Sequence, residues 1–141
     1  MKRLVLDTDV VVAGMRSPRG ASAALLLAAS ERTITALASL PLAKEYEAVC
    51  VRPEHRKAAE LTKEQVQVFL NGVLASVEPV EIYFLWRPQL HDANDEMVLE
   101  AAINGRAEAI VTFNRRHYDT AAKQFGIAVL TPAEVLKRIR R

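Results

Sequence analysis

The chain has 141 residues, half of them apolar and 26% charged, and its formal net charge at pH 7 is +2. The apolar content excludes a disordered chain, and the length fits a single domain over residues 1–141 with a substantial core. The net charge is too small to indicate a nucleic-acid partner by itself, so such a function must rest on local clusters of residues.

The single cysteine and the short apolar stretches indicate the setting of the protein. Cys50 has no second cysteine with which to form a disulfide or a thiolate metal site, which fits a reducing, cytoplasmic environment. No stretch approaches the roughly 20 apolar residues that a membrane span needs. The N-terminal apolar run has no small-residue cleavage site, so we expect no signal peptide.

Residues 4–14 form the first predicted element, with the sequence Leu-Val-Leu-Asp-Thr-Asp-Val-Val-Val-Ala-Gly. Its apolar, β-branched residues predict a strand buried on both faces, as in a parallel sheet. Asp7 and Asp9 interrupt the apolar run, and ionised carboxylates beside a core need a cation or hydrogen-bond donors. We therefore expect these aspartates at a cationic site at the end of the strand. The alternative is that Asp7 caps the next segment or accepts backbone N–H groups.

Helices and strands alternate in the rest of the chain. The predicted helices cover residues 22–29, 39–50, 62–77, 94–105 and 131 onward, and the further strands cover 33–37, 78–85, 108–112 and 127–130. Loops are predicted at 14–20 and 86–93, and a basic loop with a short helical stretch at 114–125. This alternation implies parallel crossovers with helices on both faces of one sheet, which is an α/β fold.

Helix ends are marked by capping residues. Residues 62–65 (Thr-Lys-Glu-Gln) and 131–134 (Thr-Pro-Ala-Glu) have the spacing of capping boxes. Asn94 or Asp95 is expected to cap the helix that ends at Gly105.

Carboxylates are the side chains that point to chemistry, because the sequence has no Gly-x-Ser-x-Gly elbow and no phosphate-binding glycine loop. Glu45 lies on the helix after the second strand, and Asp92 and Asp95 flank the start of a later helix. With Asp7, these acids would suit Mg²⁺ or Mn²⁺, which prefer oxygen ligands and need few carboxylates. The alternative for Asp95 is a role as helix cap alone.

Five segments, in order along nearly the whole chain, carry a more specific signal. They are 4–10 (Leu-Val-Leu-Asp-Thr-Asp-Val), 39–53 with Ser-Leu-Pro-Leu-Ala-Lys-Glu-Tyr and a trailing Val-Arg-Pro, 92–102 (Asp-Ala-Asn-Asp-Glu-Met-Val-Leu-Glu-Ala-Ala), 109–114 (Ala-Ile-Val-Thr-Phe-Asn) and 127–134 (Ile-Ala-Val-Leu-Thr-Pro-Ala-Glu). Together they resemble the PIN domain family, in particular its single-domain toxins of toxin–antitoxin (VapBC-like) pairs. The resemblance implies a three-layer α/β/α, Rossmann-like fold with a parallel sheet of about five strands, and an Mg²⁺- or Mn²⁺-dependent ribonuclease.

The resemblance also assigns metal ligands. Asp7, Glu45 and Asp95 match the three acids that such proteins use to hold metal, and Asp92 matches an extra aspartate of some branches. Water activated by the ion would then attack a phosphodiester in line. Asp9 or Asp92 would hold an outer-shell water.

The residues around the fourth strand include one departure from the family pattern. Thr112 matches the threonine that ends this strand, but the family usually has an aspartate shortly after it, where this chain has Asn114. The missing charge leaves a second metal ion in question. Arg115, Arg116 and His117 follow and are placed to contact the RNA backbone, or else form a solvated basic loop.

The resemblance further implies partners. Toxins of this kind pair with a small antitoxin and form dimers, and the apolar helices near Leu25 and Phe69 are candidates for the dimer surface if they are not core. A catalytically decayed PIN-like binding module is an alternative, which Asn114 favours. A haloacid dehalogenase-like phosphatase is another, with Asp7 as nucleophile and Asp9 as acid, although its later lysine and Gly-Asp motif are not evident.

Overall fold

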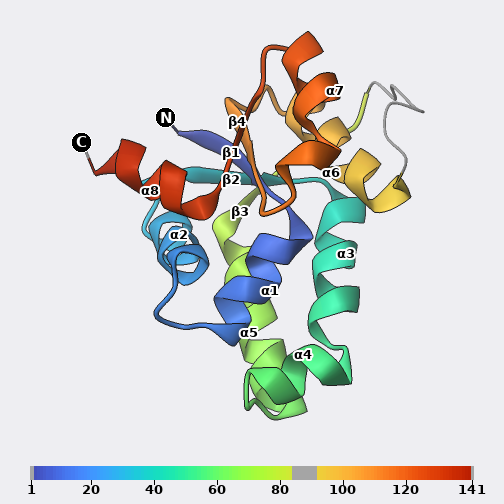
Figure 1. Cartoon of the computed structure of the whole chain (residues 1–141). Coiled ribbons are helices and arrows are strands. Elements are labelled where there is room, and N and C mark those ends of the chain that lie inside the picture. Colours follow the sequence, from blue (N-terminus) through green and yellow to red (C-terminus); the bar gives the residue numbers. More distant parts are fainter. Residues whose placement is uncertain (1, 84–91, 141) are drawn as a thin grey trace.

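A five-stranded parallel sheet organises the molecule (Figure 1). The computed structural model describes residues 2–83 and 92–140. Its strands are β1 (Arg3–Leu6), β2 (Thr35–Ala38), β3 (Val77–Pro79), β4 (Ala109–Val111) and β5 (Ala128–Leu130), in the order β3-β2-β1-β4-β5. All neighbouring pairs are parallel, as the alternation of strands and helices predicts. The chain leaves central β1 toward one edge and later returns through β4 to the other.

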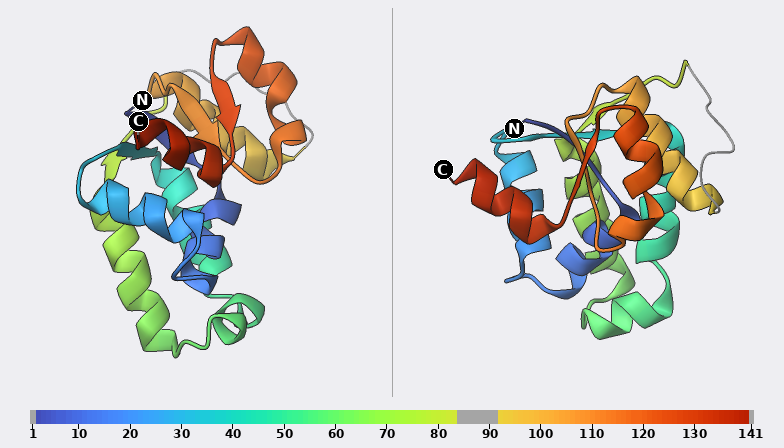
Figure 2. Two further views of the ribbon diagram at one scale, coloured as in Figure 1. Left: turned by 60° about the vertical axis from the view of Figure 1, so that its left-hand side comes forward. Right: turned by 45° about the horizontal axis from the view of Figure 1, so that its top comes forward.

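Helices cover both faces of this sheet. They are α1 (Thr8–Arg16), α2 (Ala21–Ser30), α3 (Leu40–Cys50), α4 (Pro53–Ala58), α5 (Lys63–Ser76), α6 (Ala93–Asn104), α7 (Asp119–Gln124) and α8 (Pro132–Ile139), with a 3₁₀ turn η1 (Arg115–His117). In Figures 1 and 2, α6 and α7 lie on one face, and α2, α5 and α8 lie on the other. The predicted three-layer α/β/α arrangement is therefore confirmed.

The prediction of one long strand over residues 4–14 is wrong. Strand β1 ends at Leu6, and helix α1 begins at Thr8, capped by Asp7, whose Oδ1 accepts the Thr8 N–H at 2.8 Å. The apolar run continues because Val10 and Val11 are fully buried on the helix. Asp7 thus caps the following helix, which is the alternative considered for it, and it lies at the end of the core strand, where the cationic site stays a prediction.

Most other elements lie within a few residues of their predicted positions, and both capping boxes form. The cap of α6 differs, because Asp92 rather than Asn94 or Asp95 accepts an N–H, that of Asn94 at 2.8 Å. Helix α4 was not predicted. Strand β3 is shorter than predicted, and residues 84–85 of that strand and 86–91 of the following loop lie outside the described part of the chain.

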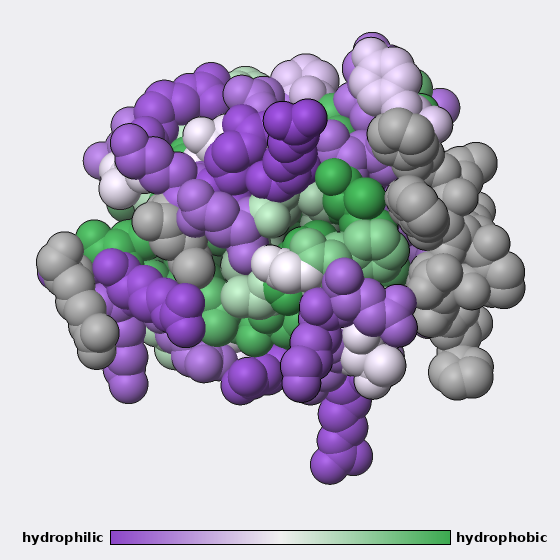
Figure 3. Space-filling view, turned by 90° about the horizontal axis from the view of Figure 1, so that it is seen from above, coloured by the Kyte–Doolittle hydropathy of each residue, from purple (hydrophilic) through white to green (hydrophobic). Residues whose placement is uncertain are grey.

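The core lies between the sheet and its helices. Leu25 is fully buried and Phe69 packs partly buried against the core, so the exposed apolar side chains of α2 and α5 are instead Leu27 and Val68. Polar and charged side chains cover most of the face seen in Figure 3, with apolar ones showing between them near its middle. Within the described residues, no helix is long and apolar enough to cross a membrane.

Candidate functional site

The site lies at the topological switch point of the sheet, between β1 and β4. Strands β1 and β4 are neighbours, yet the chain continues from one toward β2 and from the other toward β5. In open α/β sheets, ligands bind in the crevice outside the carboxyl ends of the strands at this switch point. Asp7 follows β1 directly and Thr112 follows β4, and the Asp7 N–H donates to the carbonyl of Val111 at 2.9 Å. The topology thus brings residues that are far apart in the sequence together at the carboxyl ends of β1 and β4.

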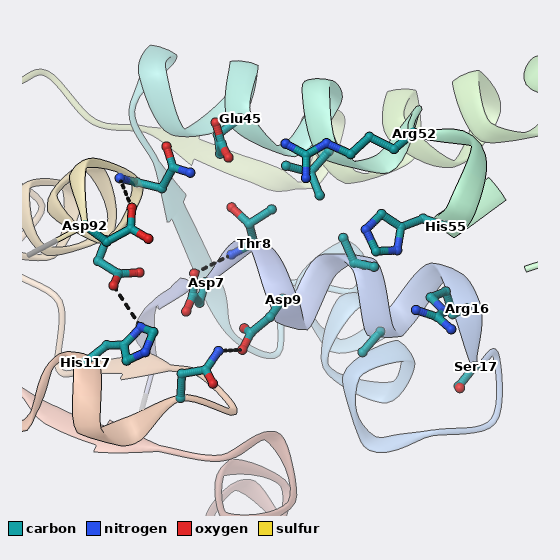
Figure 4. A pocket seen from close by; sticks show the side chains of 16 residues that line it. Asp7, Thr8, Asp9, Arg16, Ser17, Glu45, Arg52, His55, Asp92 and His117 are labelled. Atoms are coloured by element: carbon teal, nitrogen blue, oxygen red, sulfur yellow. Dashed lines mark hydrogen bonds and ion pairs between the residues drawn. The ribbon is translucent and has the colours of Figure 1, made fainter. Parts of the chain in front are cut away.

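A pocket of about 640 Å³ opens at this edge (Figure 4). Five of its lining residues are the predicted acids: Asp7, Asp9, Glu45, Asp92 and Asp95. They come from the end of β1 and the starts of α1 and α6, with Glu45 on α3. The structure therefore gathers every carboxylate that the sequence singled out.

Asp7 is the most buried of these acids, with 8% of its surface exposed. Its Oδ2 accepts the Thr112 hydroxyl at 2.7 Å, in addition to the cap at Oδ1. Burial raises the pKa of the Asp7 carboxyl, and the nearby charge of Asp95 raises it further, although the hydrogen bonds act in the opposite direction. The ionised form therefore lacks part of the stabilisation that it has in water.

Asp9 lies one position into α1 and faces the loop after β4. Its Oδ2 accepts the Phe113 N–H and the Asn114 side-chain amide, both at 3.0 Å, and Thr112 Oγ1 lies at 3.5 Å. Its Oδ1 is buried and accepts no hydrogen bond from any described residue. Burial and the charge of Asp7 raise the pKa of Asp9 to about 6.

Asp95, at the start of α6, is held by two side chains that follow β4. Its Oδ1 accepts the Tyr118 hydroxyl at 2.9 Å, and its Oδ2 lies 2.8 Å from His117 Nδ1. Tyr118 is fully buried, and its burial together with the charges of Asp7 and Asp95 raises its pKa, so it stays a hydroxyl donor. The position of Asp95 is thus fixed by two neighbouring side chains.

Glu45 and Asp92 are less constrained. The Glu45 side chain is half-buried on α3, across the pocket from α1 (Figure 4), and it has no hydrogen bond or ion pair with any described residue. Helix α3 is anchored beside it, since the buried Tyr46 hydroxyl donates to the carbonyl of Leu6. Asp92 is exposed and caps α6.

The donor set fits a hard divalent cation. All five acids offer oxygen, and the unpartnered buried Asp9 Oδ1 is a group that a cation would satisfy. No three carboxylate, imidazole or thiol groups of residues 2–83 and 92–140 are arranged to hold an ion together. Mg²⁺ does not need that arrangement, because it keeps several waters and is usually bound by one or two carboxylates with substrate phosphate.

The raised pKa of Asp9 predicts how stability without metal depends on pH. The folded state binds the Asp9 proton more tightly than the unfolded state does. The stability that this proton contributes to the fold is therefore complete below the ordinary pKa of 3.8 and is lost as the pH rises through about 6. Asp9→Asn should therefore raise the free energy of unfolding by about 1–2 kcal/mol at about pH 7.5, a value reduced for partial exposure, and by little at about pH 4.

Urea unfolding in EDTA measures this difference, with Asp119→Asn, an exposed acid outside the pocket, as the matched control. An Asp9→Asn variant less stable than the wild type at neutral pH would contradict the assigned pKa.

The basic loop is only partly at the site. His117 lines the pocket, but Arg115 and Arg116 line a separate hollow with Phe113 and Asn114, and Arg115 forms an ion pair with Glu134 at 3.1 Å. Glu134 is also the capping-box residue of α8. Arg115 thus links the loop after β4 to the start of α8 through this ion pair. The contacts of Arg115 and Arg116 with RNA stay predictions.

Sequence reasoning missed the basic residues of the pocket. Arg16, Arg52 and His55 lie toward the end opposite Asp92 and His117 (Figure 4), and Ser17 lies beside them. No described residue forms an ion pair or hydrogen bond with the guanidinium group of Arg16 or Arg52. Arg52 lies in one of the five segments that carry the family resemblance, but no substrate contact was predicted for it, although its position just after the Glu45 helix places it near the acids.

The comparisons with known proteins agree with this architecture. A family model described as the PIN domain matches residues 3–116. One chain of the crystal structure of VapBC2 from Rickettsia felis, bound to a DNA fragment from their promoter, is similar with a TM-score of 0.60 and 17% identity. The similarity covers 89% of this chain and 96% of that one, and it concerns the fold alone. No curated protein matches the sequence.

Proposed function

Because the chain belongs to the PIN domain family, whose members are generally nucleases, we propose that it is an Mg²⁺- or Mn²⁺-dependent endoribonuclease. The observation that carries the proposal is the gathering of five carboxylates in one pocket at the carboxyl ends of β1 and β4. The proposal includes a role as the toxin of a toxin–antitoxin pair in the cytoplasm.

In this proposal the acids share the task of holding the ion. Asp7, Glu45 and Asp95 bind it, and Asp92 adds a fourth carboxylate at the exposed rim. When bound, such an ion polarises a phosphodiester and makes water more acidic. Thr112 and Tyr118 orient Asp7 and Asp95 through their hydroxyl groups, at 2.7 and 2.9 Å. Partners of this kind fix ligand orientation in metal sites.

The basic end of the pocket supports a polyanionic substrate. Within the described residues, Arg16 and Arg52 keep their guanidinium donors unpaired, and His55 Nδ1 is buried without a hydrogen-bond partner, while His55 Nε2 lies 3.9 Å from the Glu54 carboxylate. Arginine binds phosphate through several N–H donors in a planar fork. A strand whose scissile phosphate lies at the acids would therefore have a neighbouring phosphate near these residues.

Arg52→Gln should weaken the binding of a short single-stranded RNA by about three- to tenfold and reduce the salt dependence of binding by about one phosphate contact. Fluorescence anisotropy in EDTA, which excludes cleavage, measures both quantities. Arg138→Gln on α8 removes the same charge from an exposed position outside the pocket and should change neither. Equal weakening by the two variants would show that only net charge matters.

The fold similarity to a chain of the VapBC2 complex supports a protein partner, and we propose a small antitoxin that covers the acidic pocket. We also propose self-association through α2 and α5, because their exposed apolar residues Leu27 and Val68 would be shielded from water in a dimer.

The central experiment is cleavage of an end-labelled single-stranded RNA, with a DNA of the same sequence as comparison. Internal cleavage is expected with Mg²⁺ or Mn²⁺, none in EDTA, and recovery when the ion is returned. Ion binding without cleavage of any RNA would favour the catalytically decayed module. Cleavage that persists in EDTA would contradict the proposal. The family match leaves no support for the dehalogenase-like alternative.

A further inference from the structure

Asp9 and Asn114 form a hydrogen-bonded pair in the lining of the pocket. The Asn114 side-chain amide donates to Asp9 Oδ2 at 3.0 Å, joining the start of α1 to the loop after β4. The Phe113 N–H donates to the same oxygen, and its partner Oδ1 is buried and receives no hydrogen bond from any described residue. The pair therefore fixes one carboxylate oxygen, while the other stays without a hydrogen bond from the described part of the chain.

Residue 114 must be a donor in this arrangement. An ionised aspartate there would bring a second carboxylate to the Asp9 oxygen that the amide now contacts, beside the further charge of Asp7. Like charges this close are unfavourable, whereas an amide next to a carboxylate is favourable. Positions 9 and 114 thus have room for one negative charge between them.

We propose that Asp9 is a further carboxylate ligand of the divalent ion, and that Asn114 is the positioning residue that holds it. This inference rests on the proposed metal-dependent function. It implies that ion binding depends strongly on the Asp9 carboxylate and less on the Asn114 amide, because the Phe113 N–H still holds Asp9 Oδ2 when the amide is removed.

Mn²⁺ binding by isothermal titration calorimetry tests both dependences directly. The proteins are the wild type, Asp9→Asn, Asn114→Ala, and Asp119→Asn as the charge-matched control. Asp9→Asn should weaken Mn²⁺ binding by at least about tenfold, as loss of a group that holds the ion does. Asn114→Ala should weaken it by about three- to tenfold, because Asp9 loses one of the groups that orient it and keeps the Phe113 N–H.

Thermal unfolding of each protein in EDTA checks that the variants fold. An Asp9→Asn variant that binds Mn²⁺ like the wild type would overturn the inference, as would an Asn114→Ala variant that does so. Both results would leave the proposed ribonuclease standing. A wild-type protein that binds no Mn²⁺ would overturn the inference and the proposed function together.

Discussion

The Asp7→Asn variant is expected to lose RNA cleavage by at least about a thousandfold, which corresponds to about 4 kcal/mol of transition-state stabilisation. Asp7 lies at the switch point of the sheet, is nearly buried, and adjoins the acids from α1 and α6. Its replacement removes one negative charge from the centre of the proposed ion site. Initial rates on the end-labelled RNA measure the loss.

The fold should survive this change. Asparagine keeps an oxygen that can accept the Thr8 N–H at the start of α1, and the cost of burying a charge disappears. The variant should therefore unfold in EDTA at the same temperature as the wild type or higher. Asp119→Asn should keep full activity. An Asp7→Asn protein that is folded and cleaves RNA at the wild-type rate would remove Asp7 from the mechanism.

Thr112→Val is expected to reduce both stability and cleavage. The Thr112 hydroxyl is fully buried, donates to Asp7 Oδ2 at 2.7 Å and accepts the Asn114 N–H at 2.9 Å. Valine has nearly the same shape but leaves both partners without this group. The free energy of unfolding should fall by about 1–3 kcal/mol, which is the usual cost of unsatisfied buried polar groups. Cleavage should fall by about tenfold or more, since Asp7 is no longer oriented.

Thr112→Ser separates the hydroxyl from the methyl group. It retains both hydrogen bonds, so its cleavage rate should stay within about threefold of the wild type, although a lost buried methyl lowers stability by about 1 kcal/mol. Urea unfolding and RNA cleavage of both variants decide between the two contributions. Equal losses of cleavage in the serine and valine variants would show that packing, and not the hydroxyl, positions Asp7.

The sequence contained enough to predict the sheet, because each buried strand is a short apolar run followed by a helix signal. It did not show the residue at which β1 ends. Val10 and Val11 are buried on a helix, and an apolar run alone does not distinguish a buried helix from a buried strand. The signal that decides is Asp7, whose role as helix cap was considered but not given priority. Helix α4 has no buried residue, so no apolar periodicity marked it.

The acids of the site were predictable because carboxylates beside apolar runs need a partner. The basic residues were not, because Arg16, Arg52 and His55 meet only through the packing of α1, α3 and α4. The contact between Tyr118 and Asp95 likewise joins the residue between η1 and α7 to α6, and the β4 strand separates these two in sequence. Only the folded chain shows that Asn114 donates to Asp9.

The most direct test of the central claim is to locate the ion in crystals of the protein grown with Mn²⁺, using anomalous diffraction. The account predicts an anomalous peak in the pocket, with carboxylate oxygens of Asp7 and at least one of Glu45, Asp95 and Asp9 as ligands. A pocket that contains only water at saturating Mn²⁺, or an ion bound elsewhere on the surface, would contradict it.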